Sequence, residues 1–82
     1  MKADQLQSTF QTNLKAIREA RGFSQTELGR RAKSTQNTIS ELEHGRISPT
    51  LAMIEKLCNA LDVDSDVLLT ADAVEIFLSA SA

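Results

Sequence analysis

Hydrophobic residues recur at helical spacing through the first part of the chain. Four apolar side chains share one face of a helix predicted from about residue 4 to residue 21: Leu6, Phe10, Leu14 and Ile17. Their spacings of 4, 4 and 3 residues follow the helical period. Gly22 is expected to end this helix in a left-handed conformation, and Phe23 to return to the core. No stretch alternates apolar and polar residues for long, so no strand is predicted.

Two short helices are predicted next. Ser24 is expected to cap the first, with Glu27 completing a capping box, over residues 25–33 with Leu28 and Ala32 inward. Thr35 is expected to cap the second, over residues 35–44 with Ile39 and Leu42 inward and Gly45 at its end.

A proline indicates where a fourth helix begins. We expect Ser48 to be its cap and Pro49 its first residue. The helix runs to about Asp62 along an apolar stripe: Leu51, Ile54, Leu57, Cys58 and Leu61. Asp64 or Ser65 opens a last short helix that carries three apolar residues: Val67, Leu68 and Leu69. The pattern therefore predicts a compact all-α domain of five helices with short connections.

Composition excludes several classes of function. With 82 residues, the chain has room for one small domain, and no apolar run approaches the ~20 residues that span a bilayer. We find no secretory signal, so a cytoplasmic protein is expected. The single cysteine excludes an internal disulfide, and with one histidine it excludes a Cys/His zinc site. No nucleophile–base pair or phosphate-binding glycine loop is present, so we expect no enzyme, cofactor or small-molecule substrate.

Charge is distributed unevenly along the chain. Residues 1–46 carry eight basic and five acidic side chains, whereas residues 47–82 carry one basic and six acidic side chains. The net charge of −2 argues weakly against a nucleic-acid partner, but association responds to local potential. The basic half can face a polyanion; the alternative is an uneven solvated surface.

The segment 23–45 has the features of a helix-turn-helix. Five polar side chains lie on the outer face of its second helix: Gln36, Asn37, Ser40, Glu41 and His44. Glutamine and asparagine can bond an adenine edge with two hydrogen bonds, and hydroxyls can bond bases or phosphates. Uncharged hydrogen-bonding groups at a helix N-terminus are what a helix in the DNA major groove uses to reach base edges.

Over roughly residues 10–69 the chain resembles the Cro and lambdoid-repressor type of helix-turn-helix domain. The matching elements, in order along the chain, are Ile17-Arg18, Gly22, Ser24-Gln25-x-x-Leu28, Ile39-Ser40-x-Leu42-Glu43-x-Gly45, Pro49 and Leu57-x-x-Ala60-Leu61. The resemblance implies a five-helix domain that binds double-stranded operator DNA as a symmetric homodimer.

The resemblance also implies roles for individual residues. Those that match base-reading positions are Thr35, Gln36, Asn37, Ser40 and Glu41. Those expected at DNA phosphates are Ser24, Gln25, Arg30, Arg31, Lys33, Thr38, His44 and Arg46. Arg18 and Glu43 match a partly buried ion pair that joins the first helix to the recognition helix. For His44 and for the Arg30-Arg31 pair, the alternative is a solvated surface residue without a special role.

Three positions depart from the pattern of the family. Lys33 occupies a turn that often holds glycine, and a left-handed conformation there costs about 1 kcal/mol. Gly29 stands where alanine is common; it allows close helix contact but lowers helix propensity. Glu41 would be repelled by DNA phosphates unless it accepts from a cytosine amino group or is neutralised by a base such as Arg30. Glu41 is therefore either a specificity residue or a bystander.

The chain is expected to divide into a DNA-binding domain, residues 1–70, and a C-terminal segment, residues 71–82. In that segment Val74, Phe77 and Leu78 share a helical face, for which we expect a dimer interface; the alternative is packing on the chain's own first helix. The expected function is a transcription regulator, a repressor or controller protein, that binds a pseudo-palindromic operator. The alternative is a module that pairs with a larger regulator as its protein partner, without productive DNA binding.

Overall fold

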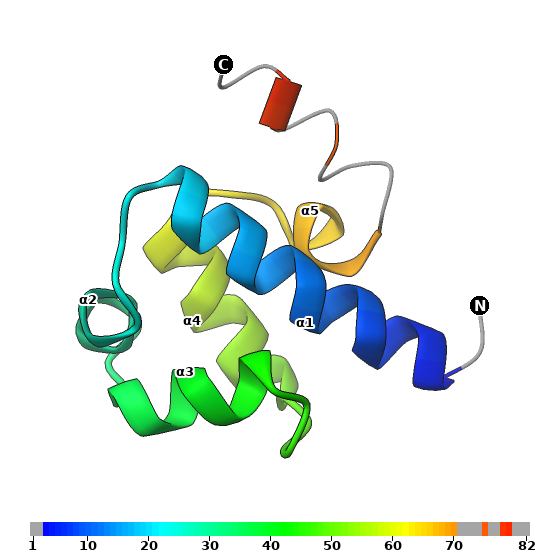
Figure 1. The fold of residues 1–82 in the computed structure, drawn as a ribbon, viewed down its shortest axis with the longest axis horizontal. Helices are drawn as coiled ribbons and strands as arrows, with labels where there is room; N and C mark the ends of the chain where they lie inside the picture. The colour runs from blue at the N-terminus through cyan, green and yellow to red at the C-terminus, as the bar shows by residue number, and fades with distance from the viewer. Residues whose placement is uncertain (1–2, 71–74, 76–77, 80–82) are drawn as a thin grey trace.

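The described part of the protein folds as five helices joined by short connections (Figure 1). The structure, a computed structural model, describes residues 3–70, 75 and 78–79. The helices are α1 (Ala3–Ala20), α2 (Gln25–Arg31), α3 (Gln36–Glu43), α4 (Leu51–Leu61) and α5 (Ser65–Leu69). The described residues contain no strand, so the predicted all-α, five-helix class is confirmed.

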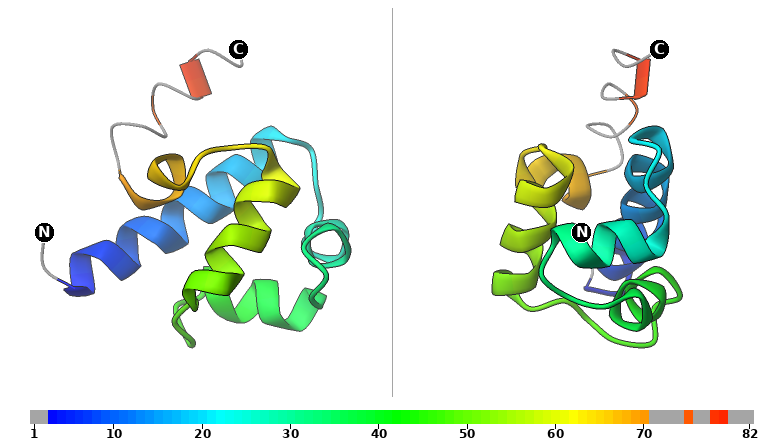
Figure 2. Two further views of the ribbon diagram at one scale, coloured as in Figure 1. Left: turned by 180° about the vertical axis from the view of Figure 1, so that it is seen from behind. Right: turned by 90° about the vertical axis from the view of Figure 1, so that its left-hand side faces the viewer.

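The longest helix, α1, packs against shorter helices at both ends of the molecule. It contacts α3 toward one end of the molecule and α5 toward the other, while α4 contacts both α2 and α5. The three views in Figures 1 and 2 agree that α3 and α5 lie toward opposite ends of the molecule. The outer surface of α3 is therefore well separated from the acidic turn that precedes α5.

The core draws on all five helices. Its buried members are Phe10, Leu14, Ile17, Leu28, Ala32, Ile39, Leu42, Leu57, Cys58, Leu61 and Leu68. Two residues of the predicted apolar stripes do not belong to the core: Leu6 is 42% exposed and Leu51 is 86% exposed. Leu6 lies in the N-terminal part of α1, which extends past the other helices (Figure 1). Leu51 is the first residue of α4.

The start of α4 differs from the prediction. Thr50, not Ser48, caps the helix: its side chain accepts a hydrogen bond from the backbone N–H of Met53 at 3.1 Å. Pro49 lies in the extended lead-in and is not the first helical residue. Ser48 and Thr50 are both good capping residues, and proline is compatible with either start, so local preference could not choose between them.

The first three helices end in the same way, with a residue of positive φ just after the helix. These residues are Gly22 (φ 76°), Lys33 (φ 54°) and Gly45 (φ 72°). The N–H of each bonds a carbonyl three residues back, and the next N–H bonds a carbonyl five residues back, at 2.7 to 3.2 Å. This is the Schellman arrangement, which satisfies carbonyls at the helix end. The left-handed conformation predicted for Lys33 is confirmed.

Two polar side chains of α1 and its end satisfy the carbonyls of later helices. The buried Asn13 amide donates to the carbonyls of Val67, Leu68 and Thr70 at 3.1, 3.2 and 2.9 Å. Arg21 donates to the carbonyl of Leu61 at 2.9 Å and to that of Asp62 at 3.1 Å. These bonds fix α4 and α5 on α1, and hence the framework that supports α3.

Candidate nucleic-acid interface

Helix α3 is held against α2 by a contact that only glycine permits. A Cβ atom on Gly29 would lie 2.7 Å from the carbonyl carbon of Thr35 and 2.9 Å from the nitrogen of Gln36. Because both atoms belong to the backbone, a larger residue could fit only if one helix moved. The departure from the family's usual alanine is thus explained by the closeness of α2 to the start of α3.

Hydroxyl caps define where α2 and α3 begin, as predicted. Ser24 accepts from the N–H of Glu27 at 3.0 Å, and Thr35 accepts from the N–H of Thr38 at 3.1 Å. The Thr35 hydroxyl also donates to the Thr38 hydroxyl at 3.0 Å. The prediction that Glu27 completes a capping box is wrong, because its carboxylate bonds Arg30 and Arg31 and not the backbone N–H of Ser24. A guanidinium attracts a carboxylate more strongly than a neutral amide does.

The outer face of α3 brings the predicted base-reading residues together. Ile39 and Leu42 are buried beneath the helix. Thr35, Gln36 and Asn37 are exposed at its N-terminal end, and Ser40 and Glu41 are half-buried one turn further on. A polar face on a helix supported from behind has the shape that fits a DNA major groove.

The predicted ion pair between Arg18 and Glu43 is present. Arg18 Nε donates to Glu43 Oε2 at 2.7 Å and Nη2 donates to Oε1 at 3.2 Å, while Nη1 donates to the carbonyl of Phe23 at 2.8 Å. The two side chains are only 11% and 3% exposed. The carboxylate raises the pKa of Arg18, which outweighs the opposing effect of burial.

A pair of glutamines joins the starts of α2 and α3. Gln36 Nε2 donates to Gln25 Oε1 at 2.8 Å, and Gln25 Nε2 donates to Glu43 Oε1 at 3.1 Å. Sequence reasoning selected Gln25 and Gln36 separately, for a phosphate and a base, and missed that they bond each other. This bond could have been predicted, because each glutamine is the first residue of its helix and the two helices were expected to pack together.

The arginines of α2 already have partners within the protein. The carboxylate of Glu27 accepts from Arg30 and from Arg31, the latter at 2.8 Å. These two arginines hold the pKa of Glu27 below its ordinary value, and the same pairing raises the pKa of Arg30. Arg31 also lies over the ring of Phe23, at 4.4 Å from its centroid. Both guanidiniums remain exposed, at 69% and 46% of their side-chain surface.

Glu41 is paired with a basic residue, although not with Arg30, which was named as an example of such a base. Its partner is Arg46, whose Nη1 lies 3.4 Å from Glu41 Oε1. Arg30 instead pairs with Glu27 on its own helix at i,i+3. The pair places one basic and one acidic group at the C-terminal end of the recognition face.

Two further phosphate candidates flank α3. His44 Nδ1 lies 2.7 Å from the carbonyl oxygen of Ser40. Since a carbonyl only accepts, Nδ1 carries the proton of this bond, and Nε2 is left for another ligand. Lys33 is exposed in the turn between α2 and α3 and has no ion pair within the part of the chain that the structure describes.

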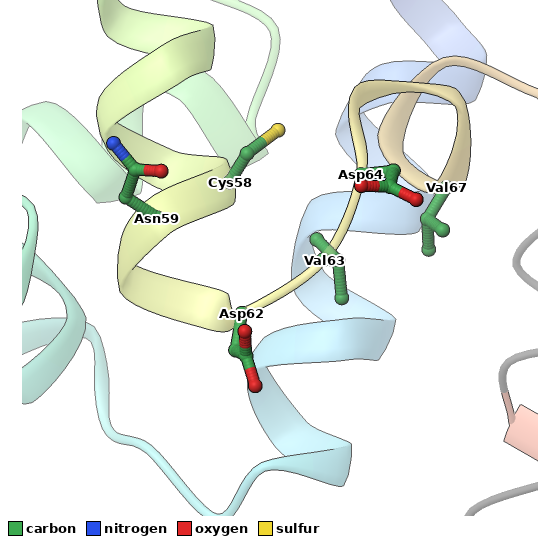
Figure 3. A pocket seen from close by; sticks show the side chains of 6 residues that line it. All are labelled: Cys58, Asn59, Asp62, Val63, Asp64 and Val67. Atoms are coloured by element: carbon green, nitrogen blue, oxygen red, sulfur yellow. The ribbon is translucent and has the colours of Figure 1, made fainter.

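The hollow drawn in Figure 3 offers a different chemistry. It lies between the end of α4 and the start of α5, holds about 430 Å³, and is lined by Cys58, Asn59, Asp62, Val63, Asp64 and Val67. Burial, with the nearby charges of Asp64 and Asp66, raises the pKa of the Cys58 thiol. Two carboxylates and no cation line this hollow, so it disfavours a polyanion, in contrast to the α2–α3 surface.

The predicted dimer residues lie partly outside the described part of the chain. Val74 and Phe77, two of the predicted dimer residues, lie outside the described residues, and Leu78 is 37% exposed. Within the described ranges, no three His, Cys, Asp or Glu side chains come close enough to hold a metal ion. No helix in that same part of the chain is both long and apolar enough to cross a membrane.

Comparison with known proteins bears on the α2–α3 surface. The helix-turn-helix family model matches residues 14–68. An uncharacterized HTH-type transcriptional regulator of Sinorhizobium fredii, y4dL, is 41% identical over 51 residues, 62% of this chain and 26% of that protein. The chain thus spans about a quarter of this relative. The crystal structure of a hypothetical transcription factor from Neisseria, NHTF, is similar with a TM-score of 0.80 and 28% identity, covering 95% of this chain and 90% of that chain.

Proposed function

Because the chain belongs to the helix-turn-helix family, we propose that it is a DNA-binding transcription regulator that reads a pseudo-palindromic operator through α3. The observation that carries the proposal is the exposed, uncharged N-terminal end of α3, formed by Gln36 and Asn37 above a buried ion pair. These amides can each make two hydrogen bonds to an adenine edge. Ser40 and Glu41 extend the same face by one turn.

We assign Glu41 to specificity and Arg46 to a neighbouring phosphate. The guanidinium within 3.4 Å offsets the repulsion that a lone carboxylate would meet near DNA. A carboxylate so neutralised can accept from a cytosine amino group in the major groove. Arginine has five donors, so Arg46 can bond a phosphate while it stays close to Glu41.

The remaining phosphate contacts come from both sides of α3. Lys33 and the exposed guanidiniums of Arg30 and Arg31 supply positive charge on the α2 side. Ser24, Gln25 and Thr38 lie near the first turns of α2 and α3, where backbone N–H groups also favour an anion. His44 lies near the C-terminal end of α3, and because Nδ1–H is bonded to the Ser40 carbonyl, its Nε2 can donate to a phosphate oxygen only in the imidazolium form.

We propose that the regulator acts as a homodimer and represses by occupying its operator. The molecule measures 30 × 28 × 19 Å, so two copies side by side match the ~34 Å between successive major grooves on one face of DNA. We assign the dimer contact to the segment 71–82 through Val74, Phe77 and Leu78, with residues 1–70 as the DNA-binding domain. The exposed Leu78 supports this assignment.

A second candidate function is a protein-interaction module. The observation that favours it is that Arg30, Arg31 and Arg46 all pair with carboxylates of their own chain, in a protein whose net charge is −2. Ion pairs at the surface are weak, about 0–1 kcal/mol, so DNA can compete for these arginines. We therefore place this candidate second.

Selection of bound duplexes from a random DNA pool distinguishes the two functions. The DNA-binding proposal expects enrichment of an inverted repeat with half-sites about 10 bp apart, and loss of that enrichment in the double variant Gln36→Ala/Asn37→Ala. It also expects affinity to fall steeply with salt. If folded wild-type protein enriches no sequence, the regulator proposal fails and the protein-interaction candidate takes its place.

A further inference from the structure

Another hollow lies between the end of α2 and the middle of α4, and its lining is basic. It holds about 280 Å³ and is lined by Arg31, Ala32, Lys33, Lys56 and Asn59. Helices α2 and α4 are in contact, and the view from behind in Figure 2 shows them side by side. We call it the basic hollow, because three cations and no carboxylate of the described residues line it, the reverse of the hollow in Figure 3.

The cations of the basic hollow remain available to a ligand. Lys33 and Lys56 are exposed, and neither has an ion pair within the described ranges. Arg31 is bonded to Glu27, yet 46% of its side chain is exposed. Glu55, the neighbour of Lys56 in sequence, lines a different groove between α4 and α5. Three cations less the Glu27 carboxylate give the site a charge of +2.

Two lysines reach this hollow from positions that do not favour a lysine. Lys33 holds a left-handed conformation, with a φ of 54°, where glycine would be free of strain. A strained residue of this kind supports a hypothesis of function. Lys56 is the single basic residue among residues 47–82, which carry six acidic ones. It nevertheless lies beside the two basic residues at the end of α2.

The end of α2 repels an anion less than an open helix end would. The carbonyls of Leu28, Gly29 and Arg30 accept hydrogen bonds from the N–H groups of residues 32–34 at 2.7 to 3.1 Å. The negative charge at the end of a helix comes from carbonyls without such partners. Asn59 adds an uncharged donor, and in Figure 3 its amide points away from the Cys58 thiol.

Phosphate is the anion that fits these donors. Arginine and lysine bind phosphate oxygens through charge-assisted hydrogen bonds. A phosphate monoester carries a charge of about −1.5 to −2 at pH 7, which matches that of the site. Pockets for drug-sized ligands hold about 300–1,000 Å³, so the basic hollow suits a single phosphate group better than a large ligand.

We propose that the basic hollow is a phosphate-binding site formed by Arg31, Lys33 and Lys56. The phosphate belongs either to a free phosphate-bearing ligand or to the DNA backbone, and only the second source rests on the proposed function. The proposal gives a role to Lys56, which the α2–α3 surface does not include, and joins it to two residues of that surface in one site.

The first arm of the test needs no DNA. Inorganic phosphate replaces chloride at constant ionic strength and neutral pH, and the shifts of ¹⁵N-labelled amides around the hollow give its dissociation constant. Lys56→Gln and Lys33→Gln should each weaken binding by about 2- to 5-fold, the effect of one exposed charge. Lys15→Gln, a change at an exposed lysine of α1 outside the hollow, removes the same charge and should leave the affinity unchanged.

The second arm measures binding to a mixed-sequence DNA duplex over a range of salt concentrations. If a backbone phosphate occupies the hollow, Lys56→Gln should lower the slope of log affinity against log salt by about one, and Lys15→Gln should not. A changed slope assigns the site to the DNA backbone, whether or not the free ion also binds. Weaker phosphate binding with an unchanged slope assigns it to a free phosphate-bearing ligand.

The proposal is overturned if Lys56→Gln changes neither the phosphate affinity nor the salt slope, or if Lys15→Gln changes them as much as Lys56→Gln does. Circular dichroism spectra that match the wild type establish that the variants are folded, as expected for substitutions of exposed lysines. Failure of the wild type to bind any duplex rejects the proposed function instead, and the phosphate titration then decides on the basic hollow by itself.

Discussion

Truncation of either partner of the Arg18–Glu43 pair should cost far more stability than removal of both. Glu43→Leu leaves the Arg18 guanidinium, 11% exposed, with the Phe23 carbonyl as its partner in place of a carboxylate. Arg18→Met leaves a carboxylate that is 3% exposed with Gln25 in place of the cation. An uncompensated buried charge costs about 3–5 kcal/mol, so each single variant should lose about that much.

The double variant Arg18→Met/Glu43→Leu buries no charge and fills the same space with apolar atoms. Replacement of a buried ion pair by hydrophobic residues is often neutral or stabilising, so most of the loss should be recovered. Because each single variant should lose about 3–5 kcal/mol and the double variant close to nothing, the coupling free energy between the two substitutions should be about 6–10 kcal/mol, well above the usual range of about 0.5–3 kcal/mol for neighbouring residues.

Urea unfolding followed by circular dichroism measures this coupling. A domain of this size has a total stability of about 4–12 kcal/mol, so the single variants should unfold at low urea concentration and the double variant near the wild-type midpoint. The reasoning is refuted if each single variant loses less than about 1 kcal/mol, or if the double variant loses the sum of the two.

Three other predictions follow from individual contacts. Asn13→Ala removes the buried amide that donates to three carbonyls at the end of α5 and should lower the free energy of unfolding by about 1–3 kcal/mol, which thermal melts would show as a lower Tm; an unchanged Tm would contradict the capping role. Lys33→Gly removes a left-handed non-glycine residue and one charge, so stability should hold or rise while the slope of log affinity against log salt falls by about one; an unchanged slope would remove Lys33 from the phosphate contacts. Arg30 and Arg31 lower the folded-state pKa of Glu27, so the stability from this carboxylate is present at neutral pH and lost as the pH falls through that pKa, below about 4.5. Glu27→Gln should therefore show a smaller loss of stability between about pH 5 and pH 2 in acid titrations, and an identical profile would count against the pairing.

Local rules predicted the parts of the fold that depend on residues close in sequence. Ser24 and Thr35 cap helices because a hydroxyl can reach the N–H three residues ahead, and Gly22 and Gly45 end helices because they tolerate positive φ. The left-handed conformation of Lys33 was instead predicted from the family resemblance, because that turn often holds glycine in the family. The Arg18–Glu43 pair was predicted from family resemblance, since the two residues are 25 positions apart.

The features that the sequence did not predict are the partners that particular polar side chains choose in the folded protein. The carboxylate of Glu27 had a backbone N–H and two arginines within reach, and the arginines prevailed. Glu41 pairs with Arg46, five positions further along the chain, whereas Arg30 pairs with Glu27 on α2. Asn13 bonds carbonyls 54 to 57 residues away, and no sequence pattern indicates a bond of that separation.

In α3 the residues that hold the helix in the fold differ from those on its outer face, and this affects how related regulators can diverge. Only Ile39 and Leu42 anchor the helix in the core, and Glu43 carries the ion pair. Asn37 and Ser40 make no side-chain contact to another helix among the contacts described, so mutations there are close to neutral for folding. Under the proposed function, a gene duplicate can drift to a new operator through these outer positions without first becoming unstable, and the two copies then cease to cross-regulate.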